Sequence, residues 1–127
     1  MTKPLKALLT IMALLSFLNG VFYLLMPGFS LSIVQRLTNP IGILDTRLFG
    51  ACALGLAAIA WAARNFKDPG AQRAVGLGNM IALGLMVFVD LDGVLTGAIN
   101  WFGWLFFSAD LFLALGFGVV LLKKNPA

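Results

Sequence analysis

Four long apolar segments, separated by short stretches that hold most of the charged residues, constrain this chain more than any other feature. They run over about residues 5–26, 47–63, 73–91 and 101–122. A helix needs about 20 residues to cross the hydrocarbon core of a bilayer, and the segments approach or reach that length. Only 11% of the residues are charged, whereas soluble chains carry about 25%. We therefore expect an all-α integral membrane protein, a single transmembrane domain over residues 1–127 folded as an antiparallel four-transmembrane-helix bundle.

The connection between the first two segments is the longest. The first segment contains no small-residue cleavage site, so we expect a retained span that ends at Pro27-Gly28. Residues 29–46 are too short and too interrupted, by Arg36 and by Asn39-Pro40, to cross a bilayer. They predict a short interfacial helix over Leu31–Leu37, followed by a turn at Asn39-Pro40.

The other two connections are shorter and more polar. Residues 65–70 have the sequence NFKDPG, which predicts a turn. Residues 91–100 predict a loop in which Asp92-Gly93 forms a turn with a solvated carboxylate.

The basic residues predict the orientation of the chain in the membrane. Cytoplasmic loops carry an excess of Lys and Arg. If the four segments all span, the basic residues on the side of the termini are Lys3, Lys6, Arg64, Lys67, Arg73, Lys123 and Lys124. The opposite side has only Arg36 and Arg47. We therefore expect a multi-pass protein of the cell membrane with both termini in the cytoplasm.

The second segment is rich in Gly and Ala, which include Gly50, Gly55 and Ala57. Small side chains allow helix backbones to approach closely in a membrane. The second segment is therefore predicted to be the least lipid-exposed of the four. Cys52, the only cysteine, lies in it and is interpreted as a small packing residue that forms no intramolecular disulfide.

Asp110 is the most informative polar residue. It lies nine residues after Trp101, about 13 Å along a helix and hence near the middle of the bilayer. A carboxylate there costs at least about 2.5–3.5 kcal/mol, so it must face other helices and be paired or protonated. Arg47, at the start of the second segment, is the predicted partner. Asp110 is then either a ligand, proton or ion site, or half of a structural ion pair.

Other polar residues lie toward the same side of the membrane or inside the spans. The candidate cluster, for ligand binding or for structure, comprises Arg47, Asp110, Asp90, Asn19, Asn79 and Asn100. Asp45 is an alternative ion-pair partner for Arg47, two residues away in the sequence. Asn19 and Asn79 are predicted to form hydrogen bonds across helices or to contact a ligand.

Several classes of function have no residues to support them. Histidine and glutamate are absent, and the chain contains no zinc-protease, nucleophile-elbow or P-loop motif. The basic residues lie at segment ends and form no stripe for nucleic acid. We expect no catalytic residue, no metal site, no resident cofactor and no nucleic-acid partner, so the sequence does not favour a stand-alone enzyme.

Several short motifs carry a family resemblance. They are Asn19-Gly20, Pro27, Arg47-Leu48-Phe49-Gly50, Leu54-Gly55-Leu56, and Arg64 and Arg73 on either side of a short loop. With the order of the spans, these residues resemble the DoxX-like superfamily of small four-helix membrane proteins. The resemblance implies the same four-helix fold. In that superfamily, some members are small subunits of quinone-linked sulfur oxidoreductases and others assist assembly of membrane proteins. The redox cysteines associated with this architecture are absent here, which argues against an independent oxidoreductase.

Two classes of function remain. The first is a non-catalytic accessory or assembly subunit of a membrane complex, or a homo-oligomer. The alternative is a protein that binds a lipophilic ligand such as a quinone, or carries a small solute, with Arg47 and Asp110. A tightly packed polar cluster would favour the first class, and an open cavity beside Arg47 would favour the second.

Overall fold

The computed structural model describes residues 3–34 and 39–123, and these residues form five helices and no strand. The helices are α1 (Lys3–Leu25), α2 (Pro27–Val34), α3 (Pro40–Ala63), α4 (Pro69–Leu95) and α5 (Phe102–Leu122). Four of them, all except α2, are long and apolar enough to cross a membrane. The all-helical fold with four such helices is therefore confirmed.

The short helix predicted between the first two spans exists, but it begins earlier than expected. Pro27 does not simply end the first span, because it opens α2 directly after Met26. The Ser30 hydroxyl donates to the carbonyl oxygens of Met26 and Phe22, at 2.9 Å and 3.2 Å, and so joins the two helices across the bend. Arg36 and the predicted end of this helix at Leu37 lie outside the described residues, as does Lys124.

Side-chain caps extend the second and third long helices beyond their predicted starts. Asn39 accepts a hydrogen bond from the Gly42 amide at 2.7 Å, and Pro40 occupies the first turn. Asp68 accepts from the Ala71 amide at 2.6 Å, with Pro69 in the first turn. An Asn or Asp N-cap followed by Pro is a strong helix start, because it satisfies amides that lack a partner within the helix.

The predicted turn at Asp92-Gly93 is wrong. Helix α4 continues through both residues to Leu95, and the chain reverses later, where Gly97 has a φ of 76°. That left-handed conformation is readily adopted by glycine, which has no Cβ to clash with the backbone.

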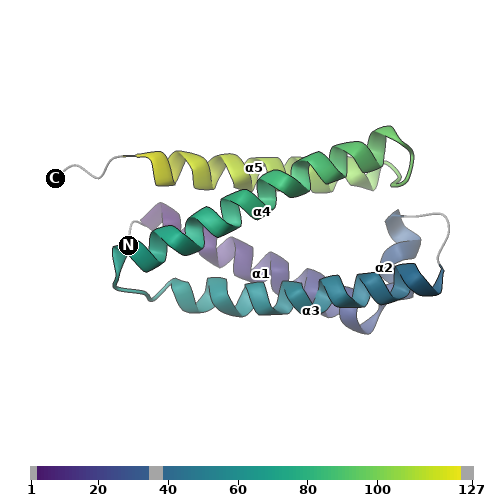
Figure 1. Ribbon diagram of the computed structural model, residues 1–127, viewed down its shortest axis with the longest axis horizontal. Coiled ribbons are helices and arrows are strands. Elements are labelled where there is room, and N and C mark those ends of the chain that lie inside the picture. The colour runs from purple at the N-terminus through teal and green to yellow at the C-terminus, as the bar shows by residue number, and fades with distance from the viewer. Residues whose placement is uncertain (1–2, 35–38, 124–127) are drawn as a thin grey trace.

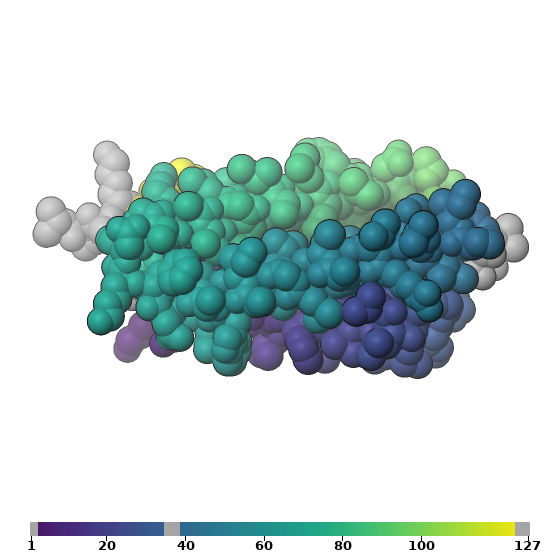
Figure 2. All heavy atoms as spheres, turned by 60° about the horizontal axis from the view of Figure 1, so that its bottom comes forward, coloured from purple at the N-terminus to yellow at the C-terminus, as the bar shows by residue number. Residues whose placement is uncertain are grey.

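The helices lie in two pairs, α1 with α3 and α4 with α5 (Figure 1). The start of α1 and the end of α5 lie at the same end of the molecule, and α2 lies at the other (Figure 1). Figure 2 shows a face on which α3 and α4 lie next to each other. Among the four long helices α3 has the largest buried share, which agrees with the prediction for the second segment.

The α1–α3 pair rests on a close approach of two glycines. A Cβ added to Gly50 would lie 2.7 Å from the Leu24 backbone nitrogen and 3.0 Å from the Gly20 carbonyl oxygen. By contrast, Gly55 has open space where its Cβ would be. The Gly- and Ala-rich composition predicted close packing, but only some of those small residues face another helix.

The apolar core lies toward the end of the molecule that holds the termini. It comprises Leu5, Leu9, Met12, Ala13, Ala60, Ala63, Leu83, Leu113, Phe117 and Leu121. Phe117 and Leu9 are fully buried. Every long helix also exposes large apolar side chains, such as Leu14, Phe88 and Phe112. Because an outer surface of this kind is costly in water but favourable in lipid, it agrees with the four apolar segments.

Candidate functional site

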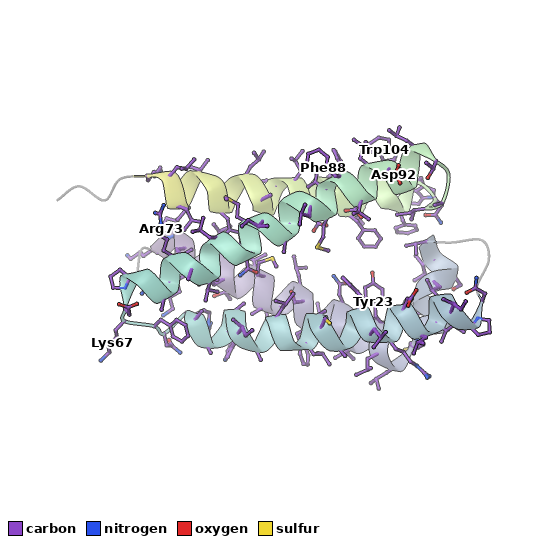
Figure 3. The ribbon with its side chains drawn as sticks, viewed as in Figure 1. Tyr23, Lys67, Arg73, Phe88, Asp92 and Trp104 are labelled. Atoms are coloured by element: carbon purple, nitrogen blue, oxygen red, sulfur yellow. The ribbon has the colours of Figure 1, made fainter. Side chains whose placement is uncertain are left out.

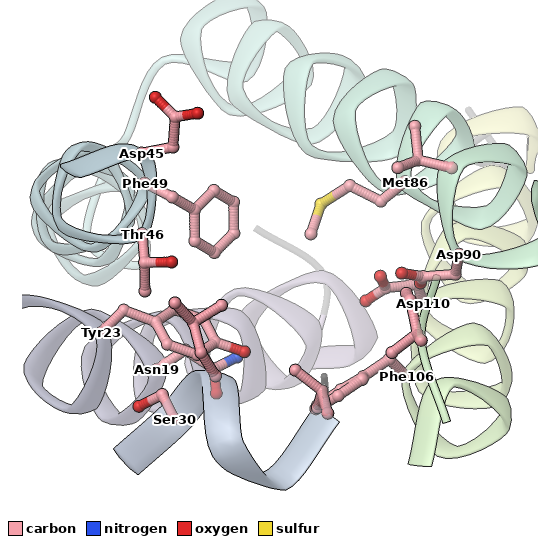
Figure 4. A pocket seen from close by; sticks show the side chains of 14 residues that line it. Asn19, Tyr23, Ser30, Asp45, Thr46, Phe49, Met86, Asp90, Phe106 and Asp110 are labelled. Atoms are coloured by element: carbon pink, nitrogen blue, oxygen red, sulfur yellow. The ribbon is translucent and has the colours of Figure 1, made fainter. Parts of the chain in front are cut away.

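A cavity of about 550 Å³ lies between the helices at the α2 end, opposite the apolar core (Figure 4). Its lining residues come from all five helices and from the linker before α5. They are Asn19, Tyr23, Ser30, Leu31, Val34, Asp45, Thr46, Phe49, Met86, Val89, Asp90, Ile99, Phe106 and Asp110. Small-molecule sites have volumes of roughly 300–1,000 Å³ and combine apolar walls with a few polar groups, so the cavity is in the range for a small ligand.

Each long helix contributes to the lining a polar residue and an aromatic or sulfur-containing residue four positions apart. The pairs are Asn19 and Tyr23 on α1, Asp45 and Phe49 on α3, Met86 and Asp90 on α4, and Phe106 and Asp110 on α5. Residues four apart lie on the same side of a helix, one turn from each other. The cavity wall is therefore a repeated combination of a polar group with a polarisable apolar group.

Asp90 and Asp110 come together from α4 and α5. Their carboxyl groups lie next to each other, on the wall opposite Phe49 (Figure 4). One oxygen of Asp90, Oδ2, is buried and has no hydrogen-bond partner among the described residues. Two carboxyl groups this close repel each other when both are ionised, so the pair favours a shared proton or a bound cation.

Arg47 does not pair with Asp110 as the sequence predicted. Its side chain is exposed and does not line the cavity. Arg47 is two residues after Asp45 and two before Phe49, which places it about 200° around the helix from each. Since those two neighbours line the cavity, Arg47 faces away from it, and the partner of Asp110 is another acid.

The predicted asparagines have three different positions. Asn19 lines the cavity. The prediction that Asn79 forms a hydrogen bond across helices is wrong, because its side-chain amide donates to the Val75 carbonyl of its own helix at 2.9 Å. Asn100 lies just outside the lining and joins α2 to the linker before α5. Its backbone amide donates to the Val34 carbonyl at 2.9 Å, and its side-chain amide donates to the Ile33 carbonyl.

Replacing Asn100 with alanine should therefore loosen the α2 end of the cavity. The variant loses the bond to Ile33 and leaves the Phe102 amide without its acceptor, Asn100 Oδ1, at 3.0 Å. We expect a loss of about 1–3 kcal/mol, measured by thermal unfolding in detergent. Asn79→Ala is the matched control and should cost less, because its bond lies within one helix. Equal losses in the two variants would show that Asn100 does not hold α2.

The aromatic walls and Met86 were not among the predicted site residues. Tyr23 and Phe49 have ring centroids 5.4 Å apart and an interplanar angle of 55°. Met86 points into the cavity from α4 (Figure 4). The signal that could have found these residues is their position four residues from each polar group inside an apolar segment.

The opposite end of the molecule is rich in basic residues and structurally separate. Lys67 and Arg73 lie there, whereas Tyr23, Asp92 and Trp104 lie toward the α2 end (Figure 3). Arg73 donates to the Leu121 carbonyl at 3.1 Å, and the Arg64 guanidinium lies 3.4 Å from the centroid of the Trp61 ring. These contacts hold the helix ends near the termini and do not reach the cavity.

Comparison with known proteins gives a family but no assigned activity. No curated protein and no solved structure matches the chain significantly. The resemblance to DoxX-like proteins stays a prediction. A family model described as a domain of unknown function, DUF8292, matches residues 1–122. Because that match covers nearly the whole chain, this protein belongs to the DUF8292 family.

Proposed function

We propose that this protein is an antiparallel four-span bundle of the cell membrane that binds a small lipophilic molecule in the cavity at its α2 end. The cavity itself carries the proposal. An accessory subunit that acts only through its outer surface needs no internal space, whereas a space of about 550 Å³ lined by every helix suits a ligand. The cavity therefore favours ligand binding over the accessory role.

The position of the cavity also supports a ligand that is partly apolar. It lies between helices whose outer faces are apolar, and four lining residues are Tyr23, Phe49, Met86 and Phe106. A molecule that reaches this site from the membrane would keep its apolar part in contact with apolar groups. The carboxyl pair and Asn19 would fix its polar part.

Filling the cavity should abolish binding. Met86→Trp places an indole in the cavity. Leu85→Trp places an indole one residue earlier, at a position outside the lining where the side chain is 63% exposed. Native mass spectrometry of the proteins, extracted with their lipids, should show a bound small molecule on the wild type and on Leu85→Trp. It should be absent from Met86→Trp. Identical spectra for all three proteins would contradict the proposed function.

The distribution of Lys and Arg supports one orientation of the protein in the membrane. The start of α1 and the end of α5 lie at one end of the molecule, and the excess of Lys and Arg at that end supports a cytoplasmic location for it. The cavity then lies in the outer half of the membrane.

Cysteines at two positions test this orientation. In a Cys52→Ser background, Asp92→Cys should react with a membrane-impermeant maleimide on intact cells. Lys67→Cys should react only after the membrane is opened. The Cys52→Ser protein alone gives the background signal. Reaction of both cysteines from outside would exclude the proposed topology.

A further inference from the structure

We propose that the ligand of this cavity is a lipophilic organic cation, with its positive centre against Asp90 and Asp110 and its apolar body against Tyr23, Phe49 and Met86. This inference rests on the proposed function and names the chemical class of its ligand. Four observations carry it: the charge of the lining, the unpartnered carboxyl oxygen, the size of the cavity and the nature of its walls.

The ionisable side chains of the lining are acidic, apart from the phenol of Tyr23. Asp45, Asp90 and Asp110 are present, and among the residues that the structure describes no lysine or arginine lines the cavity. Arg47, the nearest base in sequence, faces away from the cavity. An anion would have to approach carboxyl groups in a medium where charges are poorly screened, which costs free energy. A cation is attracted by the same carboxyl groups, which lowers the free energy of its binding.

The carboxyl pair lacks the partners that a purely structural pair would have. Asp90 Oδ2 is buried without a hydrogen-bond partner among the described residues, and the nearest ionisable group is a second carboxyl, Asp110. Buried charged or polar groups are normally paired, and an unpaired one is costly. A cation bound in the cavity beside the two carboxyl groups would relieve their repulsion.

The cavity is larger than a bare inorganic ion would need. A volume of about 550 Å³ holds a molecule with many heavy atoms. Within the described ranges, no three His, Cys, Asp or Glu side chains come close enough to hold a metal ion. Asp45 lies on the α3 wall, away from Asp90 and Asp110 (Figure 4). This arrangement suits an extended organic molecule with one charged end.

The walls have the chemistry that organic cations prefer. Aromatic faces attract ammonium groups through the negative potential above the ring, and the thioether of methionine is polarisable. Phe106 lies one turn before Asp110, and Met86 lies one turn before Asp90. Tyr23 and Phe49 form a tilted aromatic pair on the other side of the cavity. A cation therefore meets both a carboxyl group and a polarisable surface.

A pair of isosteric probes separates charge from shape. Benzyltrimethylammonium and neopentylbenzene have the same shape, with nitrogen replaced by carbon, and phenylmethanesulfonate supplies an anion of similar size. Binding of each to the full chain is measured by equilibrium dialysis in phosphatidylcholine nanodiscs, whose lipid carries no net charge. Empty nanodiscs give the background partition. We expect saturable binding of the cation that is roughly 30-fold or more tighter than that of the neutral probe.

The variants place the charge preference on the carboxyl pair. Asp90→Asn and Asp110→Asn should each remove most of the preference for the cation. Asp92→Asn is the matched control, since it makes the same change two residues from Asp90, on an exposed side of α4 outside the cavity. It should leave binding unchanged. Phe106→Leu keeps every charge and an apolar wall, and it should weaken binding of the cation more than binding of neopentylbenzene.

The outcomes distinguish this inference from the proposed function. If the neutral probe binds as tightly as the cation and Met86→Trp abolishes both, the cavity binds lipophilic molecules but the cation assignment is wrong. Preferential binding of the sulfonate would overturn the assignment as well. If no probe saturates, or if Met86→Trp changes nothing, both proposals fail. If the Asp variants unfold, the Phe106→Leu variant and the comparison of the three probes on the wild type still test whether the cavity prefers a cation.

Discussion

Replacing Phe117 with alanine is expected to cause the largest loss of stability of any single truncation in the core. Phe117 has an exposed fraction of 0% and lies among Leu9, Leu83, Leu113 and other core residues. Phe→Ala in the core of a soluble protein costs about 3–5 kcal/mol. For helices surrounded by lipid this range is an upper bound, because apolar groups are not returned to water when the helices separate. What remains is the loss of packing around the cavity left behind.

Phe112→Ala is the control for this prediction. It removes the same atoms from the same helix, but the Phe112 side chain is 72% exposed. Thermal unfolding in a mild detergent should show a clear loss for Phe117→Ala and little change for Phe112→Ala. If the two variants unfold at the same temperature, the apolar core around Phe117 does not hold the helices together as the structure describes.

Gly50→Leu should separate α1 from α3 and cause the second large loss of stability. A side chain at this position meets the backbone of Leu24 and Gly20, which cannot rotate away as a flexible side chain could. Overpacking typically costs about 1–3 kcal/mol, and more when backbone must move. Because Phe49 and Tyr23 adjoin this contact and line the cavity, the variant should also weaken ligand binding.

Gly55→Leu tests whether the effect comes from this contact or from any added bulk in α3. Gly55 lies in the same helix and has no heavy atom within 4 Å of its ideal Cβ. Unfolding temperatures in detergent should fall for Gly50→Leu and stay near the wild-type value for Gly55→Leu. A similar fall in both would mean that the face of α3 that contains Gly55 is also packed against protein.

The helices could be predicted from the sequence because length, hydropathy and local capping signals act within one segment. Apolar runs bounded by Pro, Gly and charged residues specify where helices form. Even so, the apolar segments predict the starts of α3 and α4 later than the structure has them. The Asn39-Pro40 and Asp68-Pro69 pairs are turn signals, but they are also helix starts, and the structure uses them in the second way.

The site could be predicted only in part. The sequence indicates Asp110, Asp90 and Asn19, because a polar group inside an apolar segment is costly if the helix turns it toward lipid. The sequence does not indicate their neighbours Tyr23, Phe49 and Phe106, because an aromatic residue in an apolar segment is tolerated both in lipid and in a cavity. The spacing of four residues between each aromatic and a polar group is present in the sequence, but it identifies a cavity wall only once the facing side of each helix is known.

By itself, the sequence determined how many helices form, that four of them suit a membrane, and which polar residues must avoid lipid. Tertiary structure alone decided which of those polar residues meet. Arg47 and Asp110 have opposite charges and were expected to attract each other, but α3 lies against α1 through Gly50, and in that orientation Arg47 points away from the cavity. The contacts between α4 and α5 instead bring Asp90 to Asp110. The rotation of each helix about its axis depends on packing with its neighbours, and no property of a single segment specifies it.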